Sequence, residues 1–288
     1  MKKNKTQPVK IFLATIFALI AFAANSIFCR LALKNDNIDP VGFTILRLFS
    51  GAIVLLLIAI ISGNFKKRPI KLHYFPGVML FVYALTFSLA YITLDTGTGA
   101  LILFGSVQIT MLIIALVKGN RLHLLEWLGL LIAFLGFIYI VLPTISSPSF
   151  VGFLLMMISG IAWGIYTILG KNSNNPVLDT TYNFGITLPM LCVVGLLFFN
   201  NITMSPKGIL LSIMSGGIAS GIGYSIWYFA LRDLTVTLAA VVQLSVPIIA
   251  ALGGFLFISE SIHLRFIIST ILVLGGILLV VIGKNKNS

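Results

Sequence analysis

Apolar runs of about twenty residues recur along the whole chain, separated by short polar stretches. A helix rises about 1.5 Å per residue, so each run is long enough to cross a hydrocarbon layer roughly 30 Å thick. We place ten predicted spans, centred near residues 21, 51, 85, 108, 134, 160, 190, 220, 247 and 273. The polar interruptions are too short to hold a soluble domain. The pattern therefore predicts an all-α membrane protein with ten transmembrane helices.

The composition supports this prediction. Of the 288 residues, 59% are apolar and 9% are charged, whereas soluble proteins contain about 25% charged residues. The two cysteines, Cys29 and Cys192, both fall inside apolar runs. They are therefore predicted to be small packing residues and not a disulfide.

The net charge of +12 is distributed unevenly between the loops. Loops and tails on the side of the N-terminus contain fourteen Lys and Arg residues, and the opposite loops contain three, Lys34, Lys207 and Arg265. The positive-inside rule then places both termini in the cytoplasm of a multi-pass protein in the inner cell membrane. Nucleic-acid binding is excluded, because no basic face with stacking aromatic residues lies outside the membrane.

The N-terminus leaves one alternative. Its basic residues, the following apolar run and the segment Ala21-Phe22-Ala23 imitate a secretory signal peptide with a cleavage site. Cleavage would leave nine helices. The internal repeat favours a retained first helix, because each half of the repeat needs five.

A shift of 139 residues aligns the two halves of the chain. Residues 129–142 then match residues 268–281 at five positions, and the same shift pairs Gly77 with Gly216 and Val107 with Val246. Each half holds five spans, an odd number, so the second half enters the membrane from the opposite side. We expect two inverted five-helix repeats, residues 1–143 and 150–284, joined by a hinge at 143–149. Such repeats let one central site open to either face.

Several motifs carry a family resemblance. The second repeat contains SGIAWGIYTILGK, AAVVQLSVPIIAALGGFLFISESI and LVLGGILLVV, and the first contains ILRLFSG and EWLGLLIAFLGFIYIVLP. The chain resembles the drug/metabolite transporter superfamily in its ten-helix form with two EamA-type repeats. It departs from the family pattern at Arg121, where the first repeat lacks the glutamate matched by Glu260, and before Asn25, where Ala23-Ala24 replaces the frequent Trp-Gly.

The resemblance implies a secondary transporter that works by alternating access. It implies a small polar metabolite, most simply an amino acid or related compound, moved by export. The cavity would come from the first, third, fourth, sixth, eighth and ninth spans, with the fifth and tenth peripheral. Two alternatives stay open: a lipid flippase or scramblase, and a membrane scaffold that transports nothing. The neighbours of Gln108 and Gln243 would separate a solute carrier from a lipid-handling protein. The oligomeric state, monomer or homodimer, is also open.

Enzyme signatures are absent from the sequence. It contains no HExxH, no GxSxG and no Walker-type phosphate loop, and these are the patterns that place a metal, a nucleophile or a nucleotide. The three histidines lie in or beside loops. We predict that the protein is not an enzyme and needs no metal or cofactor.

Uncharged polar and aromatic residues near the middle of the spans are the candidates for substrate binding. Each could instead join helices by hydrogen bonds. Pro247 lacks an amide hydrogen, so we expect a helix kink there that frees the carbonyl of Gln243. The candidates are Asn25, Tyr83, Thr86, Ser106, Gln108, Trp163, Tyr166, Thr167, Tyr224, Gln243 and Ser245.

Arg47 is the charged residue that lies deepest in a predicted span. It follows Pro40 by seven residues, which places it about 10 Å inside the outer boundary. Its side chain could snorkel outward or pair with Asp95. It could also face the cavity and hold a carboxylate or phosphate in a bidentate fork. All seven acids lie at loops or span ends, so transport driven by the gradient of the substrate itself is the simpler hypothesis.

Overall fold

The computed structural model describes residues 6–34, 36–63, 74–117, 124–142, 149–170, 173, 175–231, 233–234 and 242–285. Within these ranges the chain is helical and contains no β-strand, apart from one isolated antiparallel bridge between Ile38 and Met204. The elements are α1 (Thr6–Leu33), α2 (Pro40–Ile61), α3 (Tyr74–Ala90), α4 (Thr96–Val117), α5 (Leu124–Val141), α6 (Phe150–Gly170), α7 (Pro176–Leu197), η2 (Phe199–Asn201), α8 (Pro206–Ile213), η3 (Met214–Ile222), α9 (Gly223–Leu231), α11 (Val246–Ile258) and α12 (Leu264–Asn285).

Seven stretches are long and apolar enough to cross a membrane, and three shorter apolar helices accompany them. The long ones are Val9–Leu33, Pro40–Ile61, Thr96–Ile114, Phe150–Gly170, Pro176–Leu197, Pro206–Leu231 and Leu264–Gly283. The shorter ones are Tyr74–Ala90, Leu124–Ile140 and Val246–Ile258. Many large apolar side chains on their outer faces are exposed, among them Phe12, Ile61 and Leu196. This arrangement is that of a multi-pass membrane protein.

The same local pattern starts three of the helices. Asp39, Asn175 and Ser205 each accept a hydrogen bond from a backbone amide in the first turn, and each is followed by proline. These side chains satisfy amides that have no partner within the helix, and proline has no amide to satisfy. Asp39 also accepts a bond from the Thr203 amide at 2.9 Å, which ties the start of α2 to the segment before α8.

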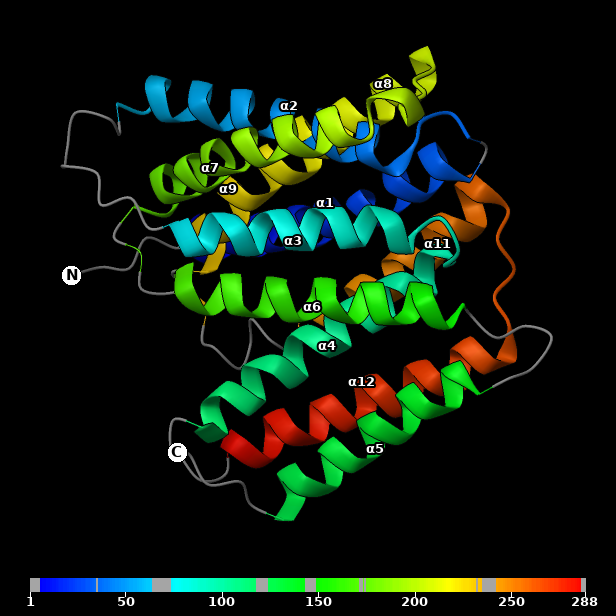
Figure 1. The fold of residues 1–288 in the computed structure, drawn as a ribbon. Helices are drawn as coiled ribbons and strands as arrows, with labels where there is room; N and C mark the ends of the chain where they lie inside the picture. Colours follow the sequence, from blue (N-terminus) through cyan, green and yellow to red (C-terminus); the bar gives the residue numbers. More distant parts are fainter. Residues whose placement is uncertain are drawn as a thin grey trace.

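The helices form a central bundle with a separate pair at its edge. α5 and α12 pack along each other, side by side at the edge of the bundle (Figure 1). A Cβ atom built on Gly129 would stand 2.5 Å from the carbonyl oxygen of Gly276, so the two backbones touch. In the centre, α6 packs against α3 and α4, and α1 packs against α9, α11 and η3.

The span from Pro206 to Leu231 contains a π-helix, η3, between α8 and α9. Its wider turn lies against α2, and a Cβ atom on Gly216 would stand 2.0 Å from the carbonyl oxygen of Arg47. In an α-helix, residues five apart face directions about 140° apart. A π-helix bonds residue i to residue i+5 and brings such residues close to one face. η3 therefore directs Ser215 and Ser220 to the same neighbour.

The expected kink at Pro247 differs from what the structure contains. α11 begins at Val246, so Pro247 lies in its first turn, after a turn at Leu244 and Ser245. Proline is favoured at that position, because an amide there needs no partner. Pro247 therefore starts a new helix where the sequence predicted a bend in a continuous one. Most of the predicted hinge, residues 143–148, and the loop with Arg121 lie outside the described residues.

Candidate functional site

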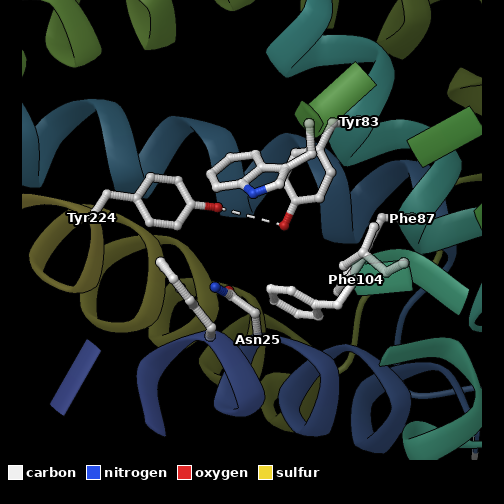
Figure 2. Close-up of a pocket in the computed structure, with 8 residues that line it drawn as sticks. Asn25, Tyr83, Phe87, Phe104 and Tyr224 are labelled. Atoms are coloured by element: carbon white, nitrogen blue, oxygen red, sulfur yellow. Dashed lines mark hydrogen bonds between the residues drawn. The ribbon is translucent and has the colours of Figure 1, made fainter. Parts of the chain in front are cut away.

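One small pocket lies in the centre of the bundle (Figure 2). The volume open to the centre of a water molecule is about 10 Å³, which is enough for a single water molecule. In this arrangement the pocket is therefore smaller than any organic metabolite. The lining residues come from α1, α3, α4, α6 and α9: Phe22, Asn25, Tyr83, Phe87, Leu103, Phe104, Trp163 and Tyr224.

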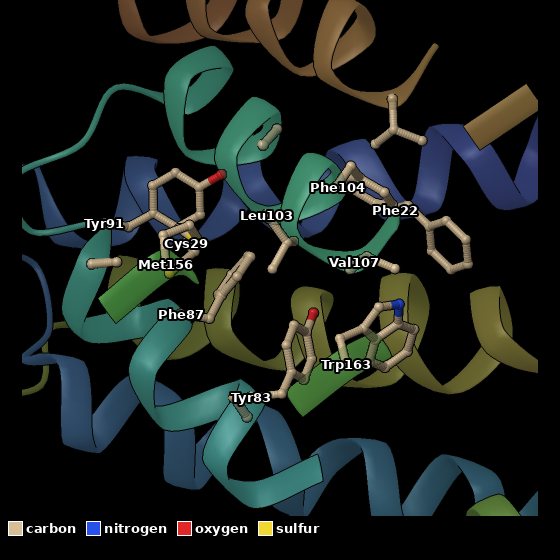
Figure 3. Close-up of a cluster of buried hydrophobic side chains, with 14 of the residues drawn as sticks. Phe22, Cys29, Tyr83, Phe87, Tyr91, Leu103, Phe104, Val107, Met156 and Trp163 are labelled. Atoms are coloured by element: carbon tan, nitrogen blue, oxygen red, sulfur yellow. The ribbon is translucent and has the colours of Figure 1, made fainter. Parts of the chain in front are cut away.

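Aromatic rings form most of the pocket wall. The ring of Trp163 lies 4.7 Å from that of Tyr83 and 5.0 Å from that of Tyr224, centroid to centroid. The ring of Phe22 is 6.5 Å from that of Trp163. Figure 3 shows the rings of Phe22, Tyr83 and Trp163 within the buried cluster that joins α1, α3, α4 and α6. Offset and edge-to-face contacts of this kind hold rings in fixed orientations.

Asn25 is the polar residue on the α1 side of the pocket. Its Oδ1 atom accepts hydrogen bonds from Ser215 Oγ at 2.8 Å and from Ser220 Oγ at 3.2 Å. Both serines belong to η3 and are buried. The π-helix thus fixes the orientation of the Asn25 amide group. Its oxygen already accepts two hydrogen bonds, so its NH₂ group is the part that can bind a ligand.

Tyr83 and Tyr224 direct their hydroxyl groups toward each other across the pocket (Figure 2). Tyr224 donates to the Tyr83 oxygen at 3.5 Å, a long hydrogen bond. The same Tyr83 oxygen accepts a bond from Arg47 Nη2 at 2.8 Å. Tyr83 therefore connects the pocket to an arginine behind its wall.

Arg47 is 1% exposed and lies behind the rings of Tyr83 and Phe87, with its guanidinium carbon 5.2 and 4.8 Å from their centroids. Its Nε donates to Ser220 Oγ at 3.4 Å. Its Nη1 has no hydrogen-bond partner in the described part of the chain. The ion pairs found there involve Arg30 only. Arg47 therefore neither snorkels outward nor pairs with Asp95, and its charge is buried beside the pocket.

A second polar cluster lies at the C-terminal end of α1, one to two turns beyond Asn25. Arg30 donates to Glu260 Oε1 at 3.0 Å and to the carbonyl oxygens of Tyr91 and Ile92 at 2.9 and 3.0 Å. Glu260 Oε2 accepts from the Thr96 amide at 2.8 Å. Asp95 lies 3.5 Å from Arg30. We call Arg30, Tyr91, Ile92, Asp95, Thr96 and Glu260 the Arg30 cluster; it ties α1 to the α3–α4 turn and to the end of α11.

Asp95 is the more exposed acid in the Arg30 cluster. Its side chain is 52% exposed, against 7% for Glu260. Partial burial raises the pKa of Asp95 above its usual range, and the nearby carboxylate of Glu260 adds to the increase, while Arg30, His263 and Lys34 oppose it. Glu260 therefore carries most of the attraction to Arg30.

The structure brings Asn25, Tyr83, Trp163 and Tyr224 together at the pocket and places Arg47 behind it. The other predicted residues lie elsewhere. Thr86 and Thr167 bond carbonyls of their own helices, Ser106 packs at Gly160, and Tyr166 accepts a bond from Asn183 at 3.4 Å. Outside the pocket lining, and partly buried, are Gln108, Gln243 and Ser245. Ser245 donates to the carbonyl of Val242.

Some residues of the site were absent from the predicted set. Phe22, Phe87, Leu103 and Phe104 line the pocket, but in a chain with 59% apolar residues nothing marks them apart from core. Ser215 was missed because α-helical spacing does not place it with Ser220. Among the described residues, no group of three His, Cys, Asp or Glu side chains is placed to hold a metal.

The bond from Ser215 to Asn25 predicts a measurable coupling. In a double-mutant cycle, Ser215→Ala and Asn25→Ala should couple by about 0.6 to 1.7 kcal/mol of unfolding free energy, the range for polar pairs between membrane helices. Unfolding in mixed micelles measures it. Ser212→Ala is the matched control, because the buried Ser212 hydroxyl bonds the Gly208 carbonyl of its own helix. A coupling near zero would contradict the assignment.

A family model for the EamA-like transporter family matches residues 9–142 and again residues 150–282. The protein PA1977 of Pseudomonas aeruginosa is 44% identical over 268 residues, covering 93% of each chain. A probable amino-acid metabolite efflux pump of Escherichia coli is 22% identical over 283 residues, covering 81% of this chain and 95% of the pump. A solved crystal structure, 17% identical, has a TM-score of 0.64 and covers 94% of this chain and 98% of its own; this last likeness concerns the fold.

Proposed function

This chain belongs to the EamA-like transporter family, and from that premise we propose that it carries a small polar metabolite across the cytoplasmic membrane by alternating access. An amino acid or a related carboxylate is the substrate class we favour, moved outward. The name of the Escherichia coli relative, an amino-acid metabolite efflux pump, supports both points by analogy.

The observation that carries the proposal is that both halves of the chain contribute residues to the central pocket. The segment matched first by the family model, residues 9–142, contributes Asn25 and Tyr83, and the segment matched second, residues 150–282, contributes Trp163 and Tyr224. A site divided between two halves opens when one half moves against the other. Seven long and three shorter apolar helices fit ten spans in two inverted repeats, with both termini in the cytoplasm.

The Arg30 cluster supports a closed outer side in this arrangement. Asn25 and Arg30 both lie on α1, five residues apart, so the cluster stands about 7.5 Å further along the helix than the pocket. By the distribution of basic residues, this is the outer end. Arg30 belongs to the first half of the chain and Glu260 to the second, and they are joined by a hydrogen bond. A substrate can therefore leave on this side only after Arg30 and Glu260 have separated.

Glu260→Gln should therefore open the outer side. We expect the buried Cys29, next to Arg30 in α1, to react about tenfold faster with a membrane-impermeant maleimide added outside, in a Cys192→Ser background. Asp95→Asn should raise the rate less, because Asp95 is more exposed and more distant from Arg30. If both variants label at the same rate as the unsubstituted protein, an outer gate at this cluster is contradicted.

A direct test of the proposed function combines binding and flux. Purified full-length protein is screened by thermal shift against metabolites, and each stabilising compound is tested for counterflow in proteoliposomes. We expect saturable flux of at least one small polar solute, persisting with a protonophore, since none of the described acids lines the pocket. A fluorescent-lipid assay in the same vesicles supplies the contrast: lipid scrambling without solute flux would replace the carrier with a lipid-handling protein.

A further inference from the structure

Most polar groups that are left for a ligand in the pocket wall and behind it are hydrogen-bond donors; the exception is the Tyr224 oxygen, which gives its hydrogen to Tyr83. Asn25 Oδ1 already accepts from Ser215 and Ser220, so its NH₂ group is what it can offer. The Tyr83 oxygen already accepts from Arg47 and Tyr224, which leaves its own hydrogen to donate. Arg47 Nη1 has no partner among the described residues, and a guanidinium has no acceptor.

The charge at the pocket has one sign. Arg47 brings a full positive charge to within 5.2 Å of two lining rings, and none of the lining residues is an acid. The Arg47 guanidinium covers the faces of Tyr83 and Phe87 that point away from the pocket. A ligand with a carboxylate would meet donors and an opposite charge. An ammonium group would meet the like charge of Arg47 and only one uncharged acceptor left among the lining side chains, the Tyr224 oxygen.

The rest of the wall is flat and apolar. Phe22, Phe104 and Trp163 present rings, and Leu103 presents an aliphatic side chain. These surfaces suit a planar apolar body, which stacks on aromatic rings in offset or edge-to-face geometry. They offer nothing to a hydroxylated or multiply charged body, because its polar groups would be buried without partners.

On the basis of the proposed function, we infer that the pocket takes a monocarboxylate with a flat apolar body and no ammonium group, in preference to the corresponding zwitterionic amino acid. The single carboxylate compensates the single buried charge of Arg47. The α-ammonium group of an amino acid would be desolvated beside a charge of the same sign, with no acid in the lining to compensate it. The pocket is too small for such a ligand in this arrangement, so the rings must move apart for it to bind.

Four compounds of nearly the same shape separate the requirements. 3-Phenylpropionate has the carboxylate alone, phenylalanine has carboxylate and ammonium, phenethylamine has the ammonium alone, and 3-cyclohexylpropionate has the carboxylate on a non-planar body. Binding to the purified full-length protein is measured by calorimetry, and counterflow is measured in proteoliposomes. We expect 3-phenylpropionate to bind at least tenfold more tightly than phenylalanine, 3-cyclohexylpropionate to bind more weakly than 3-phenylpropionate, and phenethylamine not to bind.

Two arginine variants connect the result to the pocket. Arg47→Lys keeps the charge and loses the planar fork, so it should weaken binding of 3-phenylpropionate while keeping the order of the four compounds. Arg265→Met is the matched control, because Arg265 contacts Tyr139 and the Leu142 carbonyl on the α5–α12 pair and leaves the pocket untouched. Binding that falls equally in both variants would overturn the assignment to Arg47.

The outcomes separate this inference from the proposed function. Phenylalanine bound as tightly as 3-phenylpropionate, or more tightly, overturns the inference and keeps the carrier. Counterflow of another metabolite from the screen, with no binding of the four compounds, has the same consequence. If no solute shows binding or counterflow while the protein remains folded, the proposed function fails and the inference fails with it.

Discussion

Arg47→Met is expected to reduce solute flux at least about thirtyfold while leaving the melting temperature of the protein unchanged or higher. The loss of flux follows from the removal of the one buried cation beside the pocket. Truncating one partner of a buried charged pair costs about 2 to 5 kcal/mol of binding, which corresponds to roughly thirtyfold to several thousandfold. Flux in proteoliposomes and thermal unfolding of the same preparation measure the two effects.

The stability of the substituted protein is expected to hold because Arg47 is desolvated without a matching acid. The substitution removes two hydrogen bonds from a charged donor, to Tyr83 and, at 3.4 Å, to Ser220; bonds to charged groups are worth about 1.5 to 3 kcal/mol when well formed. It also removes the penalty of a buried charge whose Nη1 is unpartnered, and methionine fills a similar volume. Replacing buried charges with apolar residues is often neutral or stabilising. A structural role would give the opposite pattern, a large fall in melting temperature with flux per folded molecule preserved.

Much of the fold could be predicted from hydropathy alone. The expected span centres fall on helices such as α2, α6 and α12, because a bilayer demands about twenty apolar residues in sequence whatever their packing. What a hydropathy pattern cannot give is rotation about the helix axis. Gln108 and Gln243 were placed at the right depth for a pocket, and neither lines it; in helices that are apolar all round, no polar stripe marks the face that points inward.

The depth of Arg47 in the membrane could be estimated from the seven residues that separate it from Pro40. Its neighbours in the fold could not be predicted in this way. Whether it faced the bundle depended on α2 packing against η3 at Gly216, a contact between residues far apart in the sequence. Ser215 shows a related limit. Its place beside Ser220 depends on a π-helix, which no residue in the segment indicates; α-helical spacing would place the two serines on different faces.

The rings of the pocket show why aromatic residues are hard to assign from one sequence. Trp163 and Tyr224 were predicted because each carries a polar atom at mid-span. Phe22 and Phe104 line the same space without one. A phenylalanine in a membrane helix packs equally well against lipid, another helix or a ligand, so composition cannot tell these roles apart.

Gly216→Ala is expected to destabilise the protein by about 3 kcal/mol, at the upper end of the usual cost of an overpacked contact, and to remove transport. The added Cβ atom would stand 2.0 Å from the Arg47 carbonyl oxygen and 2.1 Å from Ser50 Oγ. The first of these belongs to a backbone that cannot turn aside. η3 and α2 must therefore move apart, which displaces Arg47 and the bonds from Ser215 and Ser220 to Asn25. Unfolding in mixed micelles and proteoliposome flux measure the two losses.

Two further variants make this expectation specific. In Gly275→Ala the new Cβ atom meets nothing within 4 Å, so that control should be neutral or stabilised by up to about 1 kcal/mol through better helix propensity. Adding Ser50→Ala to Gly216→Ala removes the hydroxyl contact and leaves the contact with the Arg47 carbonyl, so the double variant should stay impaired. If the double variant recovers full stability and flux, the contact with the Ser50 hydroxyl is the reason that position 216 requires glycine. If Gly216→Ala behaves like Gly275→Ala from the start, the close approach of η3 to α2 does not position Arg47.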